Sequence, residues 1–236
     1  MKFVIGDIHG EITKLHRLIL RLTKIGVERL VFVGDYIDKG EDSKSTLEFL
    51  EVLSRKHRCD FLLGNHEYAW LKFIKSGDYR DFLLKYGGKE TIRDFRMLDL
   101  TIQAAKMALY LPHQEFFDDL KKFLMIGDYF ISHSGINPEF IDAKNWDELD
   151  EQEFVFQRSR AIDYKGLVKG KRQIFGHTAF TRPFYDGYKI GIDTGAALAK
   201  KNPLTAFAME ERYFINHLGD KLFLGDIDIT LNPGII

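Results

Sequence analysis

Short apolar runs alternate with stretches of helical periodicity in the first third of the chain. Residues 2–6, 29–34 and 59–64 are rich in β-branched, aromatic and other apolar side chains and predict strands. Residues 11–26 and 43–57 carry apolar side chains at helical spacing and predict the helices between those strands. This order of strand, helix and strand is typical of an α/β fold whose strands are buried on both faces.

The pattern becomes helical at about residue 67 and stays helical to about residue 120. We interpret residues 68–120 as a helical insertion packed beside the sheet, punctuated by glycines and a proline. Strand-like runs return between residues 122 and 218, and several are joined by tight turns, which predicts a second, mixed sheet. No repeat or linker divides the chain. We therefore predict one domain over residues 1–236, with helices outside two sheets.

The charge balance gives no electrostatic basis for binding a nucleic acid duplex, since 34 basic residues face 35 acidic ones. Cys59 is the one cysteine, which excludes an intrachain disulfide and a cysteine-rich metal site, and we expect it to begin a strand. No window approaches the roughly 18 apolar residues of a membrane span. The N-terminus lacks the apolar core of a signal peptide. We predict a cytoplasmic protein with no membrane partner, and leave its oligomeric state open.

Polar side chains that suit metal ions follow six of the predicted strands, each beside a glycine. These positions are Asp7 with His9, Asp35 with Asp38, Asn65 with His66, His133, His177 and Asp193. Ligands of open α/β sheets bind just outside the carboxyl ends of strands. One such turn means little, but six that share ligand types predict a site for Mn, Fe or Zn.

The spacing of Asp7 and His9 is informative on its own. Asp7 and His9, two residues apart on a stretch that we predict to be extended, would point to the same side and chelate one ion. Asp35 could bridge two ions. The remaining histidines lack such neighbours, and we interpret them as ordinary polar residues; they are His16, His57, His113 and His217.

Five motifs, "GDIHG", "GDYIDKG", "GNHE", "HSG" and "GHT", occur in an order that resembles the calcineurin-like metallophosphoesterases and, more narrowly, their PPP family. The resemblance spans nearly the whole chain. The segments "KYGGKETIRDF" and "GIDTGA" with "PLTAFAME" resemble small bacterial protein-phosphatase and diadenosine-tetraphosphatase-like members. The resemblance implies a layered fold with a central two-sheet β-sandwich flanked by helices.

The resemblance also implies two divalent metal ions, with Mn expected and Fe or Zn as alternatives. One ion would be held by Asp7, His9 and Asp35. The other would be held by four side chains, Asp35, Asn65, His133 and His177, so that Asp35 bridges the pair. Two metals about 3.5–4 Å apart can activate a bridging hydroxide for in-line attack on a phosphate ester.

The same resemblance gives roles to four other residues. His66 would be the general acid, which typically contributes about 10²–10⁴-fold to the rate, and Asp38 would orient its ring. Arg158, in "VFQRSR", would bind the substrate phosphate. Lys39 would also contact phosphate, although it stands where the family usually has an arginine, and a lysine lacks the planar fork.

A second departure is Leu63, which stands directly before "GNHE" where the protein phosphatases commonly have arginine. Arg160, Arg172 and Arg182 are candidates to compensate. The thinned set of arginines weakens the case for a phosphoprotein substrate more than the case for hydrolysis.

Four functions remain open at this point. The main prediction is a serine/threonine protein-phosphatase-like phosphomonoesterase, and the alternative is a dinucleoside polyphosphate hydrolase acting on substrates such as diadenosine tetraphosphate. A non-specific small-molecule phosphatase and a non-catalytic metal-binding scaffold are the others.

We expect four insertion residues to wall the site, Trp70, Tyr79, Tyr86 and Arg96. Their aromatic rings could stack an adenine, but we favour a core role.

Overall fold

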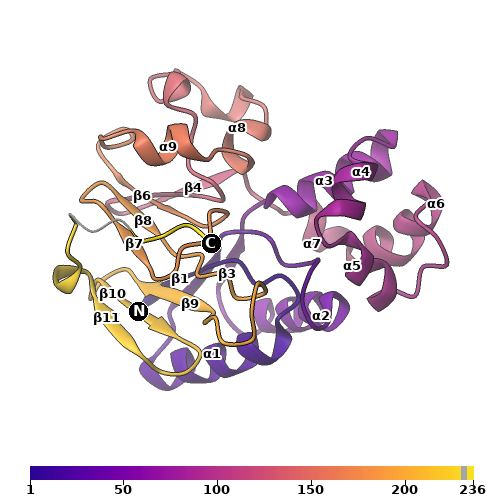
Figure 1. Ribbon diagram of the computed structural model, residues 1–236, viewed down its shortest axis with the longest axis horizontal. Coiled ribbons are helices and arrows are strands. Elements are labelled where there is room, and N and C mark those ends of the chain that lie inside the picture. The colour runs from indigo at the N-terminus through magenta and orange to yellow at the C-terminus, as the bar shows by residue number, and fades with distance from the viewer. Residues whose placement is uncertain (230–232) are drawn as a thin grey trace.

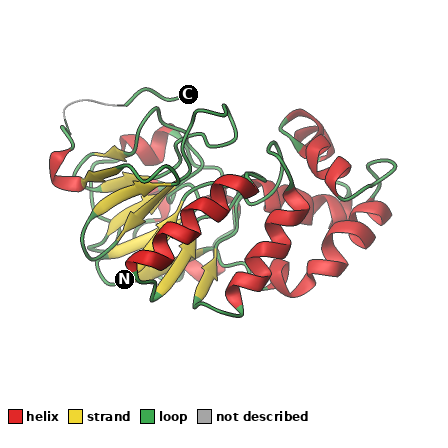
Figure 2. Ribbon diagram, turned by 90° about the horizontal axis from the view of Figure 1, so that it is seen from below, coloured by secondary structure: helices red, strands yellow, loops and turns green. Residues whose placement is uncertain are grey.

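The computed structural model describes residues 1–229 and 233–236, and its strands form two mixed sheets (Figures 1 and 2). The first sheet has the order β11-β10-β9-β1-β2-β3, with β1 parallel to β2 and β2 parallel to β3. Its strands are Lys2–Ile5 (β1), Arg29–Phe32 (β2), Cys59–Phe61 (β3), Thr205–Ala208 (β9), Tyr213–Asn216 (β10) and Lys221–Phe223 (β11).

The second sheet has the order β4-β5-β6-β8-β7, with β5, β6 and β8 parallel to one another. Its strands are Phe123–Ile126 (β4), Tyr129–Ser132 (β5), Arg172–Phe175 (β6), Phe184–Tyr185 (β7) and Lys189–Gly191 (β8). The sequence did not predict β7, which has only two residues, or β11, in which two of the three side chains are exposed.

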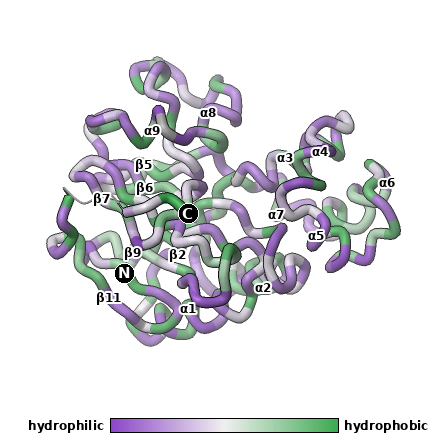
Figure 3. Tube along the Cα trace, in the orientation of Figure 1, coloured by the Kyte–Doolittle hydropathy of each residue, from purple (hydrophilic) through white to green (hydrophobic). Residues whose placement is uncertain are grey.

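The core between the sheets contains apolar side chains from both inner faces, such as Val4, Val31 and Phe207 of the first and Ile131 and Ile190 of the second. The outer face of the first sheet packs against α1 (Ile12–Ile25) and α2 (Ser43–Ser54). Hydropathy alternates along both helices, as expected of elements with one buried face (Figure 3). The short helices α8 (Gln152–Val155) and α9 (Ser159–Asp163) supply buried side chains against the second sheet.

These layers confirm the predicted α/β architecture of a two-sheet sandwich flanked by helices. The helical insertion is also present, and Figure 1 shows it extending from one side of the sheets. It comprises α3 (Asn65–Ser76), α4 (Arg80–Lys85), α5 (Gly88–Asp94), α6 (Ile102–Ala105), a π-helical turn (Lys106–Tyr110), a 3₁₀ turn (Leu111–His113) and α7 (Gln114–Asp118). Among the described residues, no helix is both long and apolar enough to cross a membrane.

Candidate active site

The residues predicted as metal ligands meet at the carboxyl ends of strands from both sheets. We call them the ligand cluster; they are Asp7, His9, Asp35, Asn65, His133 and His177. His9 Nε2 lies 3.2 Å from Asp35 Oδ2, and His133 Nε2 lies 3.4 Å from Asp35 Oδ1. Asn65 Oδ1 lies 2.9 Å from His133 Nε2 and 2.8 Å from His177 Nδ1.

Asp35 is shared by two groups of side chains that could each hold a metal ion. One group is His9, Asp35 and His66, and the other is Asp35, His133 and His177; within each group the candidate ligand atoms lie within 4.8 Å of one another. A carboxylate between two such groups fits the bridging position. His66 belongs to the first group by distance, although the sequence analysis gave it a different role.

Asp7 lies against the loop after β6 rather than within either group. Its Oδ2 accepts a hydrogen bond of 2.9 Å from the backbone N–H of His177. A Cβ on Gly176 would lie 2.0 Å from Asp7 Oδ1, so only glycine permits this approach. Asp7 Oδ1 and His177 Nε2 are buried without a hydrogen-bond partner among the described residues. Buried polar atoms without partners are rare, and bound metal ions would satisfy these two.

The backbone of His9 differs from the prediction of an extended stretch. Its φ is 46°, which is in the left-handed region, so the alternation expected of a strand does not apply there. The cause is the loop after β2, because the backbone N–H groups of Ile8 and His9 both donate to Asp35 O, at 3.1 and 2.8 Å. The two loops therefore hold each other in place at the cluster.

The protonation states of the three cluster histidines and of Asp35 suit metal ligation. Burial, followed by the charge of Lys39, lowers the pKa of His9 to about 4. Burial also lowers the pKa of His133 and of His177, so the three imidazoles are neutral at pH 7. Burial alone would raise the pKa of Asp35, but the imidazoles around it hold that pKa well below its usual range. Neutral imidazoles and an ionised carboxylate are the forms that bind metals.

His66 and Asp38 form a buried pair, with His66 Nδ1 2.7 Å from Asp38 Oδ2. The other carboxylate oxygen of Asp38 accepts hydrogen bonds from Trp70 Nε1 at 3.0 Å and from Thr91 Oγ1 at 2.5 Å. Trp70 is fully buried, which agrees with the predicted core role, and it also fixes Asp38. The sequence analysis missed the contribution of Thr91, which comes from α5 and shares no motif with Asp38.

Glu67 is a second residue that the sequence analysis missed, although it follows His66 in "GNHE". Its carboxylate is fully buried and accepts from three successive backbone N–H groups, those of Asp35 and Tyr36 at 2.8 Å and Ile37 at 3.3 Å. Burial and the nearby charge of Asp35 raise the pKa of Glu67 to about 8. Glu67 therefore ties the loop that carries Asp35 to the start of α3.

Asp193 also faces the cluster, as its position after β8 predicted. Burial raises its pKa to about 6, and its Oδ1 accepts from Gly195 N at 2.8 Å. Burial and the charges of Asp193 and Asp35 raise the pKa of Asp7 well above its usual value. Three carboxylates so close together repel one another, and a divalent cation between them would relieve that repulsion.

The two predicted phosphate-binding cations differ in how they approach the site. Lys39 Nζ lies 2.9 Å from His9 Nε2. Arg158 is exposed, and its positive charge lowers the pKa of both His177 and Asp193, so it faces the cluster from the loop before α9. Leu63 is 4% exposed and packs in the core with Tyr68, which is why no charge stands there.

The arginines proposed to compensate have other surroundings. Arg160 forms an exposed ion pair with Glu139 at 3.4 Å. Arg172 begins β6, at the opposite end of the strand from His177, and donates to Gly187 O. Arg182 is exposed. No contact of these three with the cluster appears among the described residues.

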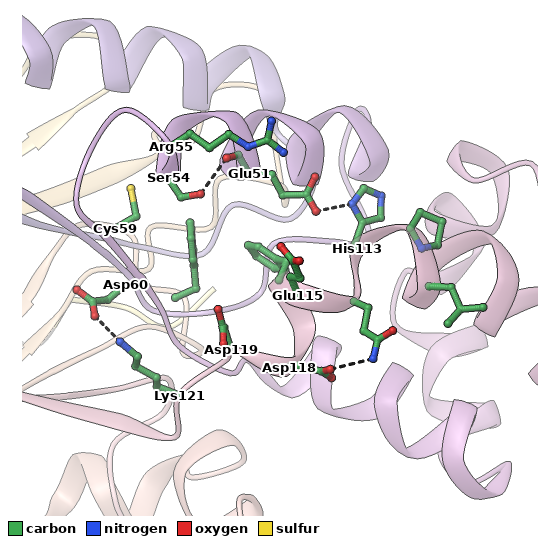
Figure 4. A pocket seen from close by; sticks show the side chains of 15 residues that line it. Glu51, Ser54, Arg55, Cys59, Asp60, His113, Glu115, Asp118, Asp119 and Lys121 are labelled. Atoms are coloured by element: carbon green, nitrogen blue, oxygen red, sulfur yellow. Dashed lines mark hydrogen bonds and ion pairs between the residues drawn. The ribbon is translucent and has the colours of Figure 1, made fainter.

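A cavity of about 910 Å³ lies elsewhere, beside β3, α2 and α7 (Figure 4). We call it the β3 cavity. Two pairs of its polar side chains face each other, with His113 Nδ1 2.8 Å from Glu51 Oε1 and Lys121 Nζ 2.5 Å from Asp60 Oδ1. Burial raises the pKa of the Cys59 thiol there to about 12, so that thiol stays protonated. No member of the ligand cluster lines this cavity.

Comparison with known proteins points to one family. The model of the calcineurin-like phosphoesterases matches residues 3–203. The asymmetrical bis(5'-nucleosyl)-tetraphosphatase PrpE of Oceanobacillus iheyensis is 25% identical over 248 residues, which cover 94% of each chain.

Two solved structures share the fold. One is a crystal structure of a candidate diadenosine tetraphosphatase, with a TM-score of 0.64, 18% identity and 91% of both chains covered. The other is the cold-active protein tyrosine phosphatase of a psychrophilic Shewanella species, with a TM-score of 0.66 and 15% identity, covering 94% of this chain and 80% of that one.

Proposed function

The chain belongs to the calcineurin-like phosphoesterase family and is a metal-dependent hydrolase of phosphate esters, and on that premise we propose that it hydrolyses dinucleoside polyphosphates such as diadenosine tetraphosphate. One observation carries this proposal: the similarity to PrpE tetraphosphatases extends over 94% of both chains, insertion included. It favours the alternative prediction over the main prediction of a protein phosphatase. The scaffold hypothesis does not fit a family of hydrolases.

The ligand cluster would hold two divalent cations, with Asp35 between them. Asp7 and His9 would complete one site, and the other would use Asn65 with His133 and His177. When bound, such ions supply Lewis-acid activation of water and of the phosphoryl oxygens. The oxygen and imidazole ligands suit Mn, with Fe and Zn as alternatives.

His66 would give its proton to the oxygen of the departing nucleotide. Asp38 accepts from Nδ1–H and so stabilises the imidazolium, which leaves Nε2–H for donation. Trp70 and Thr91 hold Asp38 in turn, so the ring of His66 is fixed before substrate arrives. The distance of 3.9 Å from His66 Nε2 to Asp35 Oδ2 puts that proton beside the cluster.

Lys39 and Arg158 would neutralise the phosphate chain from two sides of the cluster. Lys39 carries a single point charge and lacks the planar guanidinium group of arginine. It therefore suits the varied geometry of a flexible polyphosphate better than it fixes a single phosphoryl group. Leu63 leaves the third expected position uncharged. This arrangement supports a long anionic substrate over a phosphoserine or phosphothreonine side chain.

The test is a comparison of kcat/KM for diadenosine tetraphosphate and for a phosphothreonine peptide with Mn²⁺-loaded enzyme, and a chelated sample as control. We expect a preference for the dinucleotide and a loss of activity on chelation. Chromatography of the products would show whether diadenosine tetraphosphate is cleaved to ATP and AMP or to two molecules of ADP. A clear preference for the peptide would overturn the proposal in favour of the protein phosphatase.

A further inference from the structure

Aromatic side chains from the insertion lie directly beside the catalytic residues. The ring of Phe82 is 5.4 Å from the ring of His66, centroid to centroid, and 4.8 Å from that of Tyr86. His66 in turn meets His9 edge-on at 4.7 Å. We propose that Phe82 and Tyr86 form a stacking surface for a nucleobase of the substrate, and we call these two residues the aromatic shelf. This inference rests on the proposed function and adds the element that recognises the base.

The shelf is physically joined to the lysine that we assign to the phosphate chain. Lys39 N–H donates to Gly87 O at 3.2 Å, directly after Tyr86 in the chain. A Cβ on Gly87 would lie 2.5 Å from Lys39 Cγ, and the φ of Gly87 is 104°, so both contact and conformation require glycine. The side chain of Lys39 thus crosses the Gly87 turn on its way to His9.

These contacts close a ring around one wall of the site, from His9 to His66, Phe82, Tyr86, Gly87, Lys39 and back to His9. Lys39 therefore spans from the turn after Tyr86 to the ligand cluster. A nucleotide has its base a few bonds from its phosphates, so a nucleotide whose phosphate lies at Lys39 has its base near this wall.

Exposure distinguishes the shelf from the core that surrounds it. Tyr86 is 45% exposed, whereas Trp70 and Tyr68 of the same insertion are almost fully buried. Phe82 is half-buried and is held from behind by Phe156, with ring centroids 6.1 Å apart. Lys85 Nζ lies over the Tyr86 ring at 5.0 Å, which places another cation at the rim. The sequence analysis favoured a core role for these aromatics, and Tyr86 departs from it.

A fixed aromatic face with a cation beside it is what a nucleobase stacks on. Stacking on one aromatic side chain changes binding by about 5- to 100-fold on removal, and it depends weakly on which base is present. The shelf would therefore select nucleotides over base-free phosphate esters without selecting strongly among bases.

Tyr86→Leu is the first test, because Phe82 contacts too many rings to replace safely. For diadenosine tetraphosphate we expect KM to rise about 5- to 100-fold with kcat within about twofold of wild type. The inhibition constant of inorganic tripolyphosphate, which has no base, should not change. Tyr86→Trp should restore the wild-type KM. Tyr188→Leu is the matched control, since Tyr188 is a 40% exposed tyrosine at the start of β8, the end remote from the site.

Equilibrium binding by calorimetry separates this inference from the proposed function. AMP and inorganic phosphate are compared as ligands of the Mn²⁺-loaded wild type and of Tyr86→Leu. If the shelf stacks a base, AMP binds more tightly than phosphate and loses that advantage in the variant, even if the enzyme prefers a phosphopeptide as substrate. Equal binding of AMP and phosphate to wild type, or an equal rise of the KM and the tripolyphosphate constant in Tyr86→Leu, would overturn the inference.

Discussion

The ligand cluster and the β3 cavity both contain carboxylates and histidine, yet they differ in backbone strain and in hydrogen bonding. In the part of the chain that the structure describes, nine non-glycine residues have positive φ. Five of them belong to the cluster or its loops: His9, Asp35, Asp38, Lys39 and His177. None lines the β3 cavity. Two cluster atoms are buried without partners among the described residues, whereas His113 and Lys121 of the cavity are each paired with a carboxylate.

In this fold, the volume of a cavity is therefore a poor guide to where the functional side chains lie. The cavity has a volume of about 910 Å³, but its His113–Glu51 and Lys121–Asp60 pairs satisfy one another. The cluster is crowded because two sheets deliver ligands to the same place, and strained backbone persists only where surrounding structure holds it. Strain and unsatisfied atoms mark the site that a ligand completes.

The largest expected effect separates the two regions by metal content. His133→Ala removes a ligand from the cluster, so we expect the metal bound per chain to fall. Activity should drop by more than the about 10²–10⁴-fold that loss of a general acid costs. Elemental analysis of the purified variant measures the bound metal, and an activity assay measures the rate. Circular dichroism shows whether the variant is folded. A folded variant with the full complement of metal would show that His133 is no ligand.

His66→Asn should lower kcat by about 10²–10⁴-fold with both metals retained, because it removes a proton donor and not a ligand. The matched variant in the β3 cavity is His113→Asn, for which we expect activity within about twofold of wild type. If metal content fell in His66→Asn, the first group of side chains would use His66 as a ligand, as its distances permit.

The pH dependence of stability should differ between the regions in metal-free protein. His9 has a pKa lowered to about 4 from 6.5, so folded protein binds fewer protons than unfolded protein between those values. Stability is therefore lost as pH falls from about 6.5 to about 4, by at most about 3 kcal/mol. His9→Asn should flatten this part of a denaturation profile. An unchanged slope would show that His9 does not titrate as its burial suggests.

The smallest effect is expected in the β3 cavity. Burial would raise the pKa of Asp60, but hydrogen bonds from Arg29 and Lys121 lower it, so this stabilisation is present above pH 3.8 and lost as pH falls below it. Lys121 is 48% exposed, and we expect Lys121→Met to cost about 0–1 kcal/mol of unfolding free energy. Urea denaturation at pH 7 measures it, with Lys121→Arg as the control. A cost of several kcal/mol would mean that the cavity is not structurally minor.

The layered fold and the gathering of the cluster could be predicted from the sequence, because each depends on local pattern. Apolar runs gave the longer strands, and the polar residue after each run gave its position at the carboxyl edge. The edge strands β7 and β11 could not be predicted. β7 has only two residues, and two of the three side chains of β11 are exposed, so neither shows a buried apolar run.

Supporting residues were harder to predict than ligands. Nothing local shows that Glu67 binds three N–H groups of another loop, or that Thr91 donates to Asp38 from 53 residues away. The left-handed backbone of His9 follows from the carbonyl of Asp35, which the sequence near His9 does not contain. Each depends on tertiary contact, which periodicity does not encode.

The hydrogen bond from His177 N–H to Asp7 Oδ2 joins residues 170 positions apart. During synthesis, a ribosome-bound chain that has released only its first three strands presents Asp7, His9 and Asp35 without the loop that positions Asp7. Contacts between such distant residues form late. A nascent chain is therefore expected to capture metal poorly until β6 has emerged, which makes metal uptake a marker of completed folding.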